Sequence, residues 1–213
     1  MKYFFLFINL IVSVGLFAQS PPTILSVSID SISQEVHIIW ENNNPEIEGY
    51  VVYKQDATGL WTPLDTVFGL NNTSYTTIGS LASTQIEKYS ISSYDINGNS
   101  SVRSVAHNTI LLEYVVQECS DSCSLSWNAY SAFFGLNAYR VLVVGVDQST
   151  GVNVQEYYIN LSVYDTTISI PYDYQIDYYF RVDAINTFSN LALSNSVSFY
   201  SDAVAVPDYS YIN

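Results

Sequence analysis

Short runs in which apolar residues occupy every second position recur along most of the chain. In the clearest run, Val36, Ile38 and Trp40 lie on one face of an extended strand, which points that face toward a core. Beyond the apolar segment that opens the chain, no long window has the 3.6-residue period of a helix. The first half of the chain is therefore expected to form strands at residues 23–30, 36–40, 47–54, 60–67, 73–78, 87–95 and 101–108.

The same order of strands recurs in the second half. A strand with Trp127 precedes one with Tyr139, as Trp40 precedes Tyr50, and a further aromatic strand follows in each half. Copies of about 95 residues have the size of small β-sandwiches. No Pro- or Gly-rich segment separates the copies near residues 110–116, so we expect a short, stiff joint. The strands of the second copy are expected at 110–118, 122–127, 138–147, 152–160, 165–171, 176–185 and 191–200.

Six aromatic residues at matching places in the two copies are expected to fill the cores. An aromatic side chain on the inward face of a strand supplies a large apolar area to a small sandwich. These residues are Trp40, Tyr50, Tyr89, Trp127, Tyr139 and Phe180.

The motifs around these residues resemble fibronectin type III modules. The first copy matches best, with Trp40, then Gly49-Tyr50-Val-Val-Tyr53, then Tyr89-Ser-Ile91. The resemblance covers nearly the whole chain after the opening segment. It implies an all-β fold of two tandem immunoglobulin-like sandwiches, in which Trp and Tyr fill the space between two sheets.

The second copy departs from the family at one position and has a narrower resemblance of its own. Phe180 stands where the family usually has Tyr, which leaves Tyr178 or Tyr179 as candidates for the tyrosine-corner hydrogen bond. Cys119 and Cys123, ahead of a Leu-Ser-Trp-Asn-Ala-Tyr run, look like tandem modules of Bacteroidetes gliding motility-associated C-terminal domain proteins. That resemblance implies export, attachment to the cell surface and a role in gliding or adhesion.

The first 18 residues are expected to be a secretory signal peptide. Lys2 precedes an apolar run from Tyr3 to Ala18, which is short for a membrane-spanning helix of about 20 residues. A retained N-terminal anchor is the alternative. The expected division is then 1–18 signal peptide, 19–109 first module, 110–203 second module and 204–213 the start of a truncated third module, or else a tyrosine-rich tail.

The charge of the chain disfavours two classes of partner. Twenty acidic and six basic residues give a formal net charge of −14, and the bases are scattered. Without a basic patch, nucleic-acid binding is disfavoured, and anionic membrane surfaces should repel the chain. The acidity would attract Ca²⁺ or a basic partner, although dispersed acids also serve simply to keep a protein soluble.

Cys119 and Cys123 are the only cysteines and are candidates for a disulfide bond. They flank three residues that suit a hairpin turn, and opposed positions across a hairpin meet disulfide distance limits. A redox pair would instead prefer the Cys-x-x-Cys spacing. Two separate thiols are the alternative, because Cys123 aligns with the inward-facing Val36.

No pattern in the sequence predicts catalysis, a metal site or a cofactor. His37 and His107 are the only histidines, and no Ser-His-Asp or Cys-His arrangement can be built from them. Residues 95–100 superficially resemble a calcium loop but lack its Gly and its twelfth-position Glu, so a hairpin turn at Asn97-Gly98 is favoured. We therefore expect a non-enzyme.

Trp61 and Tyr53 form a candidate ligand platform. Trp61 follows a Thr-Gly-Leu turn, where a partly exposed ring would suit a sugar or a partner loop. Packing of Trp61 beside a sheet edge is the alternative.

Two functions remain open at this stage. The first is a non-catalytic extracellular or cell-surface scaffold or adhesion protein whose modules space or present a downstream domain. The second is a set of accessory glycan-binding or spacer modules of a secreted polysaccharide-degrading enzyme or protease. Either would meet a protein or glycan at the cell surface and contact a membrane only through a downstream anchor or sorting domain. In a Gram-negative bacterium, the location would be outer membrane-associated.

Overall fold

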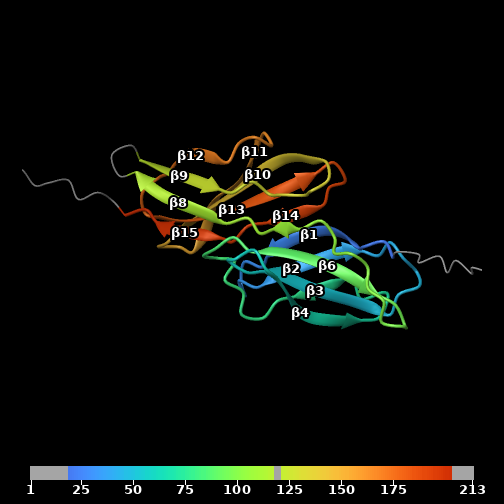
Figure 1. Ribbon diagram of the computed structural model, residues 1–213. Coiled ribbons are helices and arrows are strands. Elements are labelled where there is room, and N and C mark those ends of the chain that lie inside the picture. Colours follow the sequence, from blue (N-terminus) through green and yellow to red (C-terminus); the bar gives the residue numbers. More distant parts are fainter. Residues whose placement is uncertain (1–18, 118–120, 203–213) are drawn as a thin grey trace, which may run out of the picture.

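The computed structural model describes residues 19–117 and 121–202, which form an all-β structure (Figure 1). The expectations for residues 1–18 and 204–213, and for Cys119, concern residues outside these ranges. Within the two ranges there is no helix, and hence none that could cross a membrane. All strand pairs are antiparallel.

Two sheets in the first half of the chain pack face to face. The smaller has the order β1-β2-β5 and the larger the order β4-β3-β6-β7. Trp40 on β2 meets Tyr50 on β3 edge to face, with ring centroids 5.1 Å apart, so these two rings join the sheets. The strands are β1 (Thr23–Ile29), β2 (Val36–Glu41), β3 (Gly49–Gln55), β4 (Trp61–Phe68), β5 (Ser74–Thr76), β6 (Lys88–Tyr94) and β7 (His107–Asn108).

The second half repeats this arrangement. One sheet has the order β12-β9-β8, and the other β11-β10-β13-β14 with β15 also paired to β13. Trp127 on β9 meets Tyr139 on β10 edge to face at 5.8 Å, matching the pair in the first half. The strands are β8 (Leu112–Gln117), β9 (Ser122–Trp127), β10 (Leu136–Asp147), β11 (Val152–Leu161), β12 (Thr167–Pro171), β13 (Ile176–Asn186), β14 (Leu191–Leu193) and β15 (Val197–Tyr200).

The core lies between the sheets of each half. The six aromatic residues expected there are all buried, because each lies on the inward side of its strand. They are Trp40, Tyr50, Tyr89, Trp127, Tyr139 and Phe180.

The last expected strand of each half is interrupted, for the same physical reason. In the first half, the Ile91 N–H donates to the hydroxyl of Ser104 at 3.0 Å, while the Ser104 N–H donates to the Ile91 carbonyl at 2.7 Å. In the second half, Ser194 bonds to Val182 in the same way, at 2.9 and 2.8 Å. A side-chain oxygen thus replaces a backbone carbonyl in the ladder and breaks the strand. Residues 101–108 keep only the two-residue β7, and residues 191–200 divide into β14 and β15.

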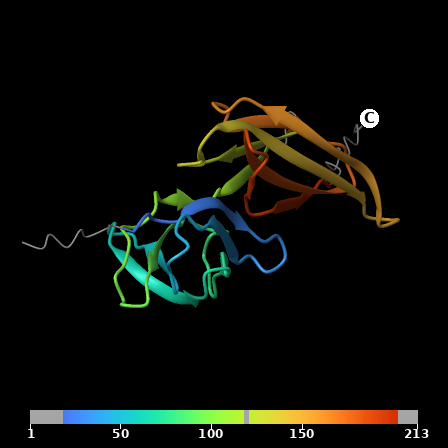
Figure 2. The ribbon, with the colours of Figure 1, turned by 90° about the vertical axis from the view of Figure 1, so that its right-hand side faces the viewer.

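The two halves contact each other where β1 lies beside β14 (Figures 1 and 2). The Leu193 N–H donates to the Ser28 hydroxyl at 3.2 Å, which ties an edge strand of the first half to the second. Ile110, on the connecting segment, and Leu112, the first residue of β8, are both buried. The connection is therefore part of the packed structure.

Candidate functional site

Tyr130 is the central residue of the joint between the halves. It follows β9, and its backbone N–H donates to the Tyr139 hydroxyl at 2.7 Å, which fixes the loop on the core of the second half. Its own hydroxyl accepts the Val27 N–H at 2.9 Å and lies 3.0 Å from Nδ1 of His107. One tyrosine therefore links the backbone of β1 to β7 and to the second half.

His107 is held neutral in this joint. Its side chain is buried, with 3% of the residue exposed, and the ring packs edge to face on Tyr130 and Phe133. Burial lowers the pKa of His107 to about 4. Because Tyr130 already accepts the Val27 N–H, its hydroxyl hydrogen is available to Nδ1 of a neutral imidazole.

Asparagine side chains close the rest of the joint. Asn108 donates to the Ala129 carbonyl at 3.1 Å and accepts from the N–H and hydroxyl of Ser131. Asn128 accepts the Leu111 N–H at 2.7 Å. Such bonds satisfy the backbone groups of a connection that would otherwise need water, and they restrict rotation of one half against the other.

An apolar cleft lies beside this joint. Its volume is about 1000 Å³, and both halves contribute to its walls. The first half supplies the segment from Ser20 to Leu25, which Asn43 holds by donating to the Pro21 carbonyl and the Thr23 hydroxyl. Concave, mainly apolar surfaces between two structural units are the usual location of binding sites. The lining residues used below are Glu41, Val105, His107, Phe133, Phe134 and Phe188.

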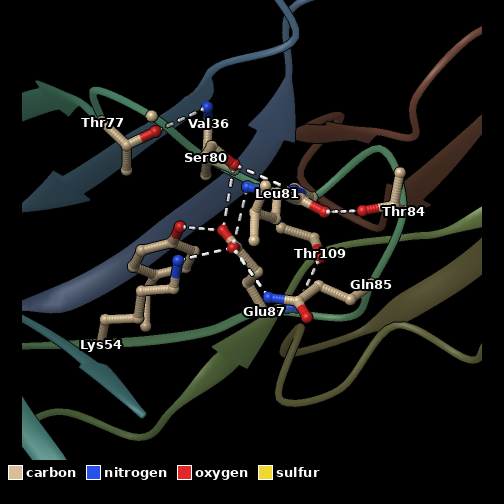
Figure 3. Close-up of polar contacts among 12 residues, drawn as sticks. Val36, Lys54, Thr77, Ser80, Leu81, Thr84, Gln85, Glu87 and Thr109 are labelled. Carbon is tan, nitrogen blue, oxygen red and sulfur yellow. Dashed lines mark hydrogen bonds and ion pairs between the residues drawn. The ribbon is translucent and has the colours of Figure 1, made fainter. Parts of the chain in front are cut away.

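The polar cluster around Glu87 is a second candidate and proves to be structural (Figure 3). The Glu87 carboxylate, almost fully buried, accepts from Lys54 Nζ at 2.5 Å, from the Tyr89 hydroxyl at 2.5 Å, and from Ser80 and the Leu81 N–H at 3.0 Å. Burial would raise the pKa of Glu87, but the hydrogen bonds from Lys54, Tyr89 and Leu81 outweigh it and lower the pKa. All of these contacts stabilise the ionised form of Glu87. Because two of them come from Ser80 and Leu81, the carboxylate also holds the loop of residues 80–87 in place.

The described residues contain no group of three His, Cys, Asp or Glu side chains placed to hold a metal ion. His37, the other histidine, lies on β2, where it is opposite Ser28 of β1 and Thr76 of β5. Asp95 closes the Asn97-Gly98 turn by accepting the N–H groups of Asn97 and Asn99. The Asp95 carboxylate is thus used to hold the hairpin turn that the sequence favoured over a calcium loop.

The expected platform residues Tyr53 and Trp61 do lie together, but with a cation over them. The Arg103 guanidinium carbon lies 5.6 Å from the centre of the Tyr53 ring and 5.3 Å from that of Trp61. These cation–π contacts occupy the space that a sugar ring would use. A ligand at this place would have to displace Arg103.

Cys123 lies on the inward face of β9, fully buried, and its thiol is free in the part of the chain that the structure describes. Burial raises the pKa of this thiol to about 11, which suppresses its reactivity. Its expected partner, Cys119, is outside the described residues, so the disulfide bond stays a prediction.

Sequence reasoning missed the residues that make the cleft. Phe134 and Phe188 come from loops 54 positions apart in the numbering and meet only in the folded chain, with ring centroids at 6.2 Å. A signal was available, since Phe133-Phe134-Gly135 places two aromatic residues in a turn, where apolar residues are uncommon.

No family model matches the chain, and no curated protein matches it. Similar solved structures include pectate lyase PelI from Erwinia chrysanthemi in complex with tetragalacturonic acid, at 17% identity and a TM-score of 0.31, over 42% of this chain and 28% of the lyase. Pectate lyase Pel3 from Pectobacterium carotovorum matches at 22% identity and a TM-score of 0.32, over 46% of this chain and 28% of the lyase. The chain thus spans less than a third of the length of these lyases, and a likeness at this level carries no functional argument.

Proposed function

We propose that the chain is a non-catalytic scaffold or adhesion protein of the extracellular space or cell surface, built from two tandem fibronectin type III-like sandwiches. Its modules space or present a neighbouring domain. The proposal is supported by the repeated sheet arrangement, in which Trp40–Tyr50 and Trp127–Tyr139 join the sheets in the same way. Folds of this kind host many functions, so the argument depends on the joint.

The observation that carries the proposal is the hydrogen bonding of Tyr130. A spacer must transmit a fixed geometry from one end to the other, and a freely rotating joint would not do so. The Tyr130 hydroxyl contacts Val27 and His107 from the first half while its N–H is bound within the second half. These hydrogen bonds favour a single orientation of the two halves.

Small-angle X-ray scattering of the purified chain tests this proposal. We expect one rigid arrangement of the halves to account for the wild-type profile. Tyr130→Ala should broaden the distance distribution, because it removes the hydroxyl and the ring that packs on Phe133. Tyr164→Ala, at a tyrosine that is 90% exposed, is the matched control and should leave the profile unchanged. A wild-type profile that requires many orientations of the halves would refute the spacer function.

A second candidate function is that of accessory modules of a secreted polysaccharide-degrading enzyme or protease. The meeting of Tyr53 and Trp61 favours it, because two neighbouring aromatic rings suit a sugar ring, which would take the place of the Arg103 side chain over them. Glycan-array binding that is lost in Trp61→Ala would support this candidate over the first. An array without signal, unchanged by the substitution, would remove it.

A further inference from the structure

We propose that the cleft beside the joint is a docking site for an extended peptide segment of a partner protein that combines basic and apolar side chains. The cleft is the 1000 Å³ hollow between the halves described above. The inference rests on the fixed joint of the proposed function, because both halves supply its walls.

The walls expose aromatic surface that the fold itself does not need. Phe134 is 80% exposed and Phe188 is 67% exposed, although the two rings stack on each other. Val105, from the opposite half, is 73% exposed and lines the same cleft. Apolar residues gathered at a hollow mark an interaction site, whereas single exposed ones carry no such meaning. The anchors of the site are therefore Phe134 and Phe188.

The edge of β1 favours an extended peptide over a small molecule. β1 is an edge strand of its sheet, and its end at Thr23–Leu25 lines the cleft. The next residues along this edge, Val27 and Ser28, already bond to Tyr130 and Leu193 of the second half. A peptide laid in the cleft would continue this line of contacts along the strand edge, which is a general mode of peptide recognition.

The charges of the cleft favour a basic peptide. Among the described residues that line it, Glu41 is the charged one, and His107 is neutral because burial lowers its pKa to about 4. The formal charge of the whole chain is −14, which would attract a cationic segment and repel an acidic one. The faces of Phe134 and Phe188 also attract cations.

The test uses fluorescence anisotropy with labelled octapeptides of alternating valine and lysine. Matched peptides replace lysine by glutamate, or valine by serine. We expect the valine–lysine peptide to bind and the other two peptides to bind at least ~10-fold more weakly. A tenfold change in Kd corresponds to about 1.4 kcal/mol of binding free energy. Phe134→Ala and Phe188→Ala should each weaken binding by about 10-fold, as anchor residues do. Glu41→Gln should weaken it by about 2- to 5-fold, as at an exposed ion pair.

Matched controls locate the effect. Phe68→Ala removes a phenylalanine that is 72% exposed on β4, outside the cleft, and Glu156→Gln removes an exposed carboxylate on β11. Both should leave binding unchanged. The proposal is wrong if no peptide binds at up to about 1 mM, if the glutamate peptide binds equally well, or if the Phe68 variant loses as much affinity as the Phe134 variant.

The same assay distinguishes the other occupants. Equal competition by benzyltrimethylammonium would identify a small organic cation as the ligand and overturn the peptide. Concentration-dependent dimerisation of the chain, lost in Phe134→Ala, would identify a second copy and also overturn it. Failure of peptide binding in a chain whose scattering shows a rigid joint would refute the docking site while leaving the proposed spacer function intact.

Discussion

The two halves of the molecule have the same strand pairing but differ at one level of their cores. This level is the set of side chains around one opposed pair of residues on the two central strands, Lys54 and Tyr89 in the first half and Val143 and Phe180 in the second. In the first half, β3 and β6 place Lys54 opposite Tyr89, and both bond to the carboxylate of Glu87. This level is ionic, with a buried charge held by an ammonium group, a phenol, a serine hydroxyl and the Leu81 N–H. The carboxylate also holds Ser80 and Leu81, so it fixes a loop as well as a core.

The corresponding level of the second half is aromatic. There β10 and β13 place Val143 opposite Phe180, and Tyr178 takes the place of Glu87 two positions earlier. The rings of Tyr178 and Phe180 stack at 6.0 Å. The Tyr178 hydroxyl accepts the Asp173 N–H at 2.9 Å, which ties down the preceding loop. The fold thus accepts a charged or an apolar solution, provided that each one anchors the adjacent loop.

The comparison predicts unequal sensitivity to substitution at this level. Glu87→Ala should reduce the free energy of unfolding by about 3 kcal/mol, because it strands Lys54 and leaves the Leu81 N–H without its partner. Tyr178→Phe, at the matching place, should cost only about 1 kcal/mol, since it removes one hydrogen bond. Urea unfolding followed by circular dichroism measures both.

Glu113→Ala, at an exposed position of β8, is the control and should change the unfolding free energy by less than about 0.5 kcal/mol. If Glu87→Ala cost no more than Tyr178→Phe, the ionic level would contribute nothing beyond an ordinary hydrogen bond. The difference between the two halves would then lack energetic meaning.

Alternation along single strands was enough to predict much of this fold. Trp40 and Val36 fall on one face because side chains of a strand alternate, and the spacing holds whatever the strand pairs with. The resemblance to fibronectin type III modules, in contrast, left both Tyr178 and Tyr179 as candidates for the tyrosine-corner hydrogen bond. The structure selects Tyr178, whose hydroxyl meets the Asp173 backbone.

The sequence predicts a short joint, but the contacts that form it and the cleft beside it could not be predicted, because they link distant residues. Val27 and Tyr130 are 103 positions apart, and nothing in the local pattern of either shows that they meet. The strand breaks at Ser104 and Ser194 depend likewise on backbone groups of another strand. Local patterns fix which way a side chain faces, while tertiary partners decide what it touches.

Acid should act on the joint before it acts on either core. His107 has an ordinary pKa of 6.5 and a pKa of about 4 in the folded chain. Below pH 6.5 the unfolded chain therefore takes up a proton at His107 that the folded chain does not. The contribution of the neutral histidine to the free energy of unfolding is complete above that pH and is lost as the pH falls toward about 4. The loss over this window should be on the order of 3 kcal/mol. Carboxylates with lowered pKa values, such as Glu87, lose their contribution only at lower pH.

Unfolding measured at several pH values between 6.5 and 4.5 tests this assignment. His107→Asn retains an acceptor near the Tyr130 hydroxyl and should flatten the decline. His37→Asn, on the outward face of β2, should leave it unchanged. A decline of equal size in both variants would move the acid sensitivity away from the joint and into the two cores.

A third pair of substitutions tests whether the halves are as alike as their strand breaks suggest. Ser104→Ala and Ser194→Ala each leave a buried backbone N–H, of Ile91 or Val182, without its acceptor, so each should cost about 1–2 kcal/mol. Amide hydrogen exchange should show the loss on β6 for the first variant and on β13 for the second. Ser198→Ala, at an exposed position of β15, should have no effect. The two serines make the same pair of bonds, so equal losses of stability are expected. Unequal losses would mean that one half provides another acceptor for its freed N–H. The two halves would then share a strand pattern but not the energies that stabilise it.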